Sequence, residues 1–84
     1  MSMTVTYSLK VMQELSKRGA TQEIFDKLGE TVKNIPRKAE LEVDTSDNAI
    51  TVLGMPISFV RDHKNGEVHI MTNAEALQLD SMKG

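Results

Sequence analysis

Between residues 38 and 72 the sequence alternates apolar and polar side chains in short runs. Residues 39–43 alternate apolar with acidic side chains, and residues 49–53 form a run rich in β-branched residues. A period of two residues is typical of half-buried strands. The pattern therefore predicts a four-stranded antiparallel β-meander. We expect its strands at about residues 38–44, 48–54, 57–63 and 67–72.

Three turn-like segments separate these strands. Residues 45–48 are small and polar, Met55-Pro56 interrupts an apolar run, and Asn65-Gly66 is typical of a type I′ hairpin turn. Because proline cannot donate a hydrogen bond to a ladder, we place a two-residue turn at Met55-Pro56. The resulting pairs are Val43 with Ile50, Leu41 with Val52, Val52 with Phe59, Asp62 with His69, and Lys64 with Glu67.

All three turns divide the side chains between two faces in the same way, since alternate strand residues point to opposite sides. The expected inward face holds Ala39, Leu41, Val43, Ile50, Val52, Ile57, Phe59, Val68 and Ile70. The expected outward face is mainly polar, but Leu53, Val60 and Met71 would be neighbours on it. The outward residues expected around these three include Glu40, Glu42, Asp44 and His69. We expect this outward patch to remain uncovered and to bind another protein.

Helical periodicity precedes the meander. Ser8 is a good N-cap for a helix over about residues 8–18, and Thr21 is a good N-cap for a second helix over about residues 21–35. Gly29 lies inside the second helix, where glycine costs about 1 kcal/mol relative to alanine and permits a break. Both helices would cover the inward face of the sheet.

The two ends of the chain carry weaker signals. Residues 3–7 are β-prone and fit either a short edge strand or a loose leader. Thr72-Asn73-Ala74-Glu75 is a capping-box pattern, which predicts a short C-terminal helix at about residues 73–82. The expected fold class is α+β, with two N-terminal helices packed on a four-stranded antiparallel β-meander and a short C-terminal helix.

Composition narrows the class of protein. The 84 residues are 39% hydrophobic and 26% charged, which indicates one globular domain over residues 1–84. There is no cysteine and hence no disulfide framework, and the sequence shows neither a signal peptide nor a stretch of membrane-span length. These features favour a cytoplasmic protein with no membrane partner.

The N-terminal half raises the alternative of DNA binding. Residues 1–38 carry a net charge of +3, whereas residues 39–84 carry −5. Residues 20–29 resemble the positioning helix and turn glycine of bacterial helix-turn-helix domains. Pro36, however, leaves only residues 30–35 for a recognition helix. Few aromatic side chains are present to stack on bases, so a DNA-binding regulator is the alternative rather than the main prediction.

A second resemblance concerns the predicted strands. Gly54-Met55-Pro56-Ile57, followed by Asn65-Gly66-Glu67-Val68-His69-Ile70, resembles a strand-turn-strand pattern of tailed-phage structural proteins. The resemblance implies a small phage-encoded protein and assigns a role to no residue.

Polar residues near Asn65 raise the question of a metal site. Asp62 and His69 are expected to face each other on the side that also carries Glu67, while His63 points the other way. At most three ligands converge on one face, and a structural zinc site takes four. We therefore expect a cross-strand Asp–His pair, and neither a metal nor a cofactor.

The sequence offers no catalytic signature. It contains no nucleophile elbow and no phosphate-binding glycine loop. We expect a non-enzymatic protein-binding domain, such as a phage-encoded inhibitor or assembly factor, that also forms a homo-oligomer through its outward sheet face. An enzymatic role would require catalytic residues from a partner chain.

Overall fold

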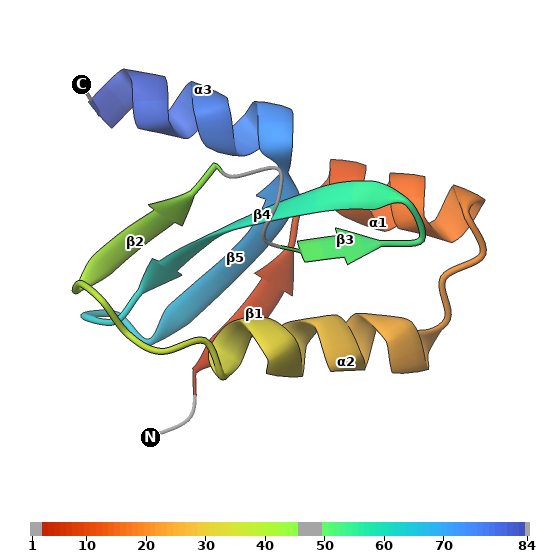
Figure 1. Cartoon of the computed structure of the whole chain (residues 1–84), viewed down its shortest axis with the longest axis horizontal. Helices are drawn as coiled ribbons and strands as arrows, with labels where there is room; N and C mark the ends of the chain where they lie inside the picture. The colour runs from red at the N-terminus through yellow and green to blue at the C-terminus, as the bar shows by residue number, and fades with distance from the viewer. Residues whose placement is uncertain (1–2, 46–49, 84) are drawn as a thin grey trace.

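The computed structural model describes residues 3–45 and 50–83 of the chain, and the side chains up to residue 79 together with that of Ser81. It has an α+β fold with three helices and one mixed five-stranded sheet (Figure 1). The elements in chain order are β1 (Thr4–Tyr7), α1 (Leu9–Lys17), α2 (Gln22–Lys33), β2 (Leu41–Asp44), β3 (Ile50–Val52), β4 (Met55–Asp62), β5 (Glu67–Thr72) and α3 (Asn73–Lys83).

The sheet is not a simple meander. Its strand order is β1-β5-β4-β2, and β3 also pairs with β4. The N-terminal segment, which the sequence left open as strand or leader, is the edge strand β1 and runs parallel to β5. The connection from β1 to β5 contains α1, α2 and strands β2 to β4, and it makes this parallel pairing possible because parallel neighbours need a crossover.

The predicted pairing of β2 with β3 is wrong. Both strands pair with β4, one after the other along the same edge, so that Asp44 lies opposite Phe59 and Ile50 lies opposite Ile57. Strand β4 is eight residues long and has room for both. Most of the predicted turn at 45–48, together with Ala49, lies outside the described residues.

The turn between β3 and β4 also differs from the prediction. It is formed by Leu53 and Gly54, with φ values of 50° and 81°, and it pairs Val52 with Met55. A type I′ turn requires positive φ at both central residues. Proline is restricted to φ near −65°, so Pro56 belongs in the strand that follows and not in this turn.

The β4–β5 hairpin is shifted by two residues from the predicted register. Asp62 pairs with Glu67, and four residues connect the strands instead of two. Only Gly66 of this connection has positive φ, while the Asp62 carboxylate accepts hydrogen bonds from the backbone N–H and side-chain amide of Asn65. A shift of two residues keeps every side chain on its face. The predicted inward positions of Ile57, Phe59, Val68 and Ile70 are therefore confirmed.

Strand β2, in contrast, is inverted relative to the prediction. Glu42 lies opposite Arg61 and Asp44 lies opposite Phe59, so both acidic residues point inward. Leu41 and Val43 consequently point outward. The physical reason is the buried guanidinium of Arg61, which takes Glu42 as its carboxylate partner.

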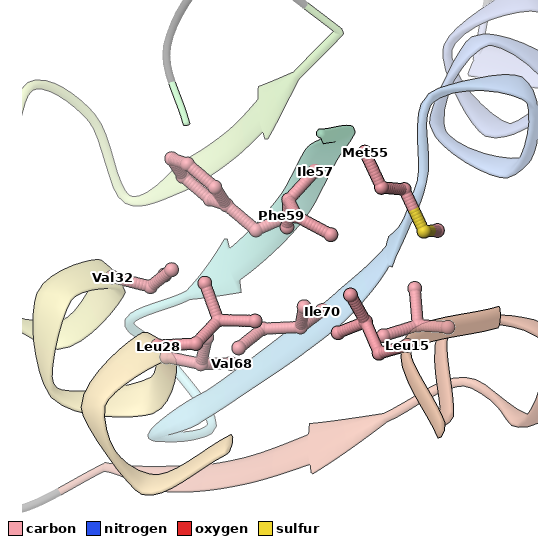
Figure 2. Close-up of a cluster of buried hydrophobic side chains, with 9 residues drawn as sticks. Leu15, Leu28, Val32, Met55, Ile57, Phe59, Val68 and Ile70 are labelled. Carbon is pink, nitrogen blue, oxygen red and sulfur yellow. The ribbon is translucent and has the colours of Figure 1, made fainter. Parts of the chain in front are cut away.

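Helices α1 and α2 cover the inward face and enclose the core, part of which Figure 2 shows. Both predicted N-caps are confirmed: Ser8 Oγ accepts a hydrogen bond from Val11 N, and Thr21 Oγ1 accepts one from Ile24 N. Helix α2 continues without a break through Gly29. The core consists of Val11, Leu15, Leu28, Val32, Met55, Ile57, Phe59, Val68 and Ile70.

Helix α3 packs against the outward face, which the prediction had left uncovered. The capping box is present, since Thr72 Oγ1 accepts from Glu75 N while Glu75 Oε1 accepts from Thr72 N. This box turns the chain back at the end of β5, and α3 then runs toward β2 (Figure 1). Ser58, Met71 and Ala76 are buried there, and Ser58 Oγ donates to Asn73 Oδ1 at 3.1 Å. In the part of the chain that the structure describes, no helix combines the length and the apolar character needed to cross a membrane.

Candidate functional site

The outward face of the sheet is built in rows of side chains, because residues that pair across neighbouring strands share a face. One row runs from Val43 through Val60 and His69 to Thr6. A second row, closer to the β4–β5 hairpin, runs from Leu41 through Asp62 and Glu67 to Thr4. A third row holds Ser58 and Met71 and is buried under α3. Helix α3 therefore leaves the first two rows accessible. We name these two rows, together with Leu79 of α3, the open sheet face.

The structure brings together only part of the predicted patch. Val60 and His69 lie next to each other on the open sheet face and are partly exposed. Met71 is on the same side of the sheet, but α3 buries it. Leu53 is 44% exposed in the β3–β4 turn, outside these rows.

The predicted acidic ring is not formed. Glu42 and Asp44 point inward, and Glu40 precedes β2 as an exposed residue. The carboxylates that do flank the apolar row on the outward side are those of Asp62 and Glu67. The prediction placed both residues on this face without assigning them to the site.

Three apolar residues of the open sheet face were missed. Leu41 and Val43 were expected inward, and Leu79 belongs to a helix whose position on the sheet was not predicted. Leu41 and Leu79 are each 43% exposed. One feature of the sequence indicates that β2 is inverted. Arg61 follows Phe59 by two residues and so points inward, where it requires a carboxylate partner.

A shallow hollow of about 340 Å³ lies between the row of Val60 and helix α3. Its lining consists of Thr6, Tyr7, Ser8, Val60, His69, Ile70, Met71 and Leu79. Most of these contribute carbon atoms, so the hollow suits an apolar side chain better than a polar ligand.

His69 is held in place from two sides. Its Nδ1 is 2.7 Å from Thr6 Oγ1, and its Nε2 is 3.5 Å from Glu67 Oε1. The neighbouring Asp62 is ionised at neutral pH, because hydrogen bonds from the Asn65 side chain and backbone hold the pKa of Asp62 below its usual value. The strand positions of the open sheet face include two carboxylates and no lysine or arginine.

The inward face holds a second polar cluster, around the buried side chain of Arg61. Arg61 Nη2 is 2.7 Å from Glu42 Oε1, and the same oxygen is 2.7 Å from His63 Nε2. The guanidinium also donates to the backbone carbonyls of Val32, Ile35 and Pro36, and so binds the end of α2. These partners of the guanidinium belong to β2, to α2 or to the segment that follows α2. This cluster therefore anchors α2 and β2 to the sheet.

The carboxylate of this cluster is ionised. Burial alone would raise the pKa of Glu42, but hydrogen bonds from His63 and from the Lys38 backbone N–H, together with the charge of Arg61, lower it overall. Glu42 Oε2 accepts the Lys38 bond at 2.7 Å. The charge pair thus persists throughout the neutral pH range.

The predicted Asp62–His69 pair is wrong, since Asp62 lies opposite Glu67 and His69 lies opposite Val60. His63, the fourth member of the predicted polar group, bonds to Glu42 on the other face. Across residues 3–45 and 50–83, no group of three or more histidine, aspartate or glutamate residues is arranged to hold a metal ion.

The helical half does not reproduce the helix-turn-helix pattern. Gly29 lies within α2 instead of in a turn, and no further helix precedes β2. The exposed side of α2 includes the acidic residues Glu23, Asp26 and Glu30. A helix surface with these acidic residues is not favourable for binding a phosphate backbone.

Comparison with protein-family models, with curated protein sequences and with solved structures finds no significant match to this chain.

Proposed function

We propose that this chain is a small non-enzymatic protein-binding domain and that the open sheet face is its contact surface. The observation that carries the proposal is the pair Val43–Val60, which lies on the outward face and remains partly exposed, with Val60 beside the exposed Leu79. Apolar side chains left accessible side by side on a small domain are typical of contact sites.

The charge of this surface defines the partner. Asp62 and Glu67 lie at one end of the open sheet face, and no lysine or arginine occupies its strand positions. A complementary partner has an apolar centre and basic residues at the matching edge, because opposite charges speed association and exclude wrong partners. An inhibitor or assembly factor encoded by a phage is the form of this function that we favour.

Site-specific photocrosslinking tests the proposal. A photoreactive amino acid at Val43 is expected to crosslink one protein in cells that naturally produce this chain, whereas the same amino acid at Thr31, on the exposed side of α2, is not. The captured protein is then purified and its affinity measured by calorimetry. Val60→Lys should weaken binding at least tenfold, since it places a charge in the apolar row.

A charge reversal provides a second test of the proposed surface. Asp62→Lys should also weaken binding, and more strongly at low salt than at high salt, because the partner is basic. Binding that is unchanged in Val60→Lys, or crosslinks that form only from the Thr31 position, would rule out this surface.

The same surface offers a route to self-association, which we keep as the second form of the proposal. A symmetric partner would bury Val43 and Val60 by packing sheet on sheet, with Asp62 and Glu67 at the rim. Light scattering at tens of micromolar distinguishes the two forms. A dimer that Val60→Lys converts to a folded monomer supports self-association, while a wild-type monomer leaves only a different partner.

A further inference from the structure

Within residues 3–45 and 50–83, one edge of strand β1 has no partner strand, and its backbone groups point away from the sheet. Thr4 N donates to Gly66 O at 2.9 Å and Ser8 N donates to Ile70 O at 2.8 Å, so the even-numbered residues face β5. In a parallel ladder the residues between them direct their N–H and C=O groups the other way. Val5 and Tyr7 therefore present two donors and two acceptors on the side opposite β5.

Strand β1 is only four residues long, but this edge lacks the charged residues and prolines that natural sheets use to prevent strand pairing. Thr4–Tyr7 contains no charged residue and no proline. At the other edge of the sheet, β2 carries Glu42 and Asp44, and β3 is only three residues long. Charged and very short edge strands discourage pairing, whereas an uncharged strand invites it. The two edges are thus not equivalent, and β1 is the receptive one.

A groove of about 420 Å³ lies between this edge and helix α2. It is lined by Val5, Tyr7, Asp26, Gly29, Glu30 and Lys33. Gly29 explains how the helix comes so close: a Cβ atom at this position would be 2.9 Å from Tyr7 Oη and 3.5 Å from Val5 Cγ1. The groove is therefore bounded by a free strand edge on one side and a helix on the other.

The helix side of the groove is acidic. Burial of the phenol, together with the charge of the nearby Asp26, raises the pKa of Tyr7. Glu30 has a 63% exposed side chain, and the cation that faces it, Lys33, is already paired with it at 3.6 Å. The charged residues of the groove are thus two carboxylates and one lysine.

We propose that the edge of β1 and this groove bind an extended peptide segment of a partner protein by strand addition, with a lysine or arginine of that segment directed toward Asp26 and Glu30. The hydrogen-bonding groups of Val5 and Tyr7 supply main-chain affinity, and the acidic helix supplies side-chain selectivity, as in other strand-addition sites. Strand β1 takes part in both surfaces, but the backbone edge of Val5 and Tyr7 and the groove against α2 are not part of the open sheet face, so either site can exist without the other.

A second copy of this chain is the less suitable occupant. Strand β1 reads Thr-Val-Thr-Tyr and offers no basic side chain to the carboxylates of the groove. Pairing of two β1 strands would also bring the acidic sides of two α2 helices toward each other. Charge complementarity therefore favours a different chain.

Amide NMR titration with defined peptides tests the proposal. The probe is an end-capped hexapeptide of alternating valine and lysine, and the matched control is the same peptide with glutamate in place of lysine. The lysine peptide should cause saturable shifts in residues 4–7 and 26–33, and the glutamate peptide should cause none. Asp26→Lys/Glu30→Lys should weaken the lysine peptide at least tenfold, and both positions are exposed, so the fold is preserved.

A backbone variant separates strand pairing from simple charge attraction. Val5→Pro removes one N–H that points into the groove and none that bonds to β5. If the Val5→Pro variant folds, the lysine peptide should cause no shifts in it. If it does not fold, the Asp26→Lys/Glu30→Lys variant tests the proposal instead. Four outcomes overturn the proposal: no saturable shift at millimolar lysine peptide, equal response to both peptides, shifts at 41–44 instead of 4–7, or β1 shifts that depend on protein concentration without peptide.

Discussion

Arg61 is the single residue on which most of the inward face depends. Its side chain is 2% exposed, yet it connects β4 to the end of α2 and to β2. Alternation from Phe59 already places Arg61 inward. The sequence cannot identify its carboxylate partner, because that choice depends on how β2 pairs with β4 far along the chain.

Removing the Glu42 carboxylate tests how much the free energy of unfolding depends on its ion pair with Arg61. Glu42→Gln leaves the guanidinium buried without its counter-charge, and we expect a loss of about 3 kcal/mol in the free energy of unfolding. The matched control is Glu14→Gln, which breaks the exposed pair of Glu14 with Lys17 and should cost less than about 1 kcal/mol. Urea denaturation measures both. Equal values for the two variants would contradict the anchoring role of Arg61.

The same carboxylate should make stability depend on pH. Because the folded-state pKa of Glu42 lies below its ordinary value of 4.5, the unfolded chain takes up the proton first as the solution is acidified. The stabilisation is fully present above the ordinary value and is lost as the pH falls through the folded value. Urea midpoints at pH 7 and at pH 3 should therefore differ less for Glu42→Gln than for the natural chain, and an undiminished difference would argue against this linkage.

Among the secondary-structure elements, the helix caps were predicted correctly, whereas the turns and the long-range strand pairing were not. Ser8, Thr21 and the Thr72–Glu75 box act through neighbours three residues away, so the sequence shows them directly. Strand partners are chosen by contacts that no local pattern contains. The pairing of β1 with β5 and the shared edge of β4 are therefore absent from the prediction. The β3–β4 turn was missed because Leu53, a poor residue for positive φ, occupies it.

Helix α2 provides a prediction in which propensity and packing disagree. Helix propensity alone would make Gly29→Ala stabilising by about 1 kcal/mol. The new methyl group would meet Tyr7 Oη at 2.9 Å, and that hydroxyl is held by a hydrogen bond to the Phe25 carbonyl. We expect a net loss of about 1–3 kcal/mol, as for other overpacked sites.

A double variant identifies the cause. Tyr7→Phe removes the obstructing oxygen, so Gly29→Ala should cost less in a Tyr7→Phe background than alone. Thermal melts of the two single variants and the double variant complete the cycle. If the two effects simply add, the contact between helix and tyrosine is not what requires glycine.

At the scale of the whole molecule, the sheet is covered unequally on its two sides. Helices α1 and α2 complete the core on one side, while α3 covers only the row of Ser58 and Met71 on the other. The sequence could place Val60 and His69 on an outward face. It could not show how far α3 extends over that face, since that depends on tertiary packing. For the inversion of β2 it contains one indirect signal, the inward position of Arg61.

Phe59 lies in the core that the sheet shares with the helices, so its substitution tests the whole fold. Its ring is 5% exposed and lies among residues from the sheet and α2 (Figure 2). Phe59→Ala should lower the free energy of unfolding by about 3–5 kcal/mol, which is a large share of the stability of a small domain. Leu9→Ala, at a position of α1 that is 66% exposed, is the control and should change it by less than about 0.5 kcal/mol. A native-like melting curve for Phe59→Ala would contradict the observed register.

The parallel pairing of β1 with β5 has a consequence for synthesis on the ribosome. Thr4 pairs with Glu67 and Tyr7 pairs with Ile70, so β1 has no partner strand until residues 67–70 have left the exit tunnel. Until then α1 and α2 also lack the strands that bury their apolar stripes. A nascent chain that stops before residue 67 therefore carries an uncharged, unpaired strand, and chaperones or neighbouring nascent chains can bind it during that interval.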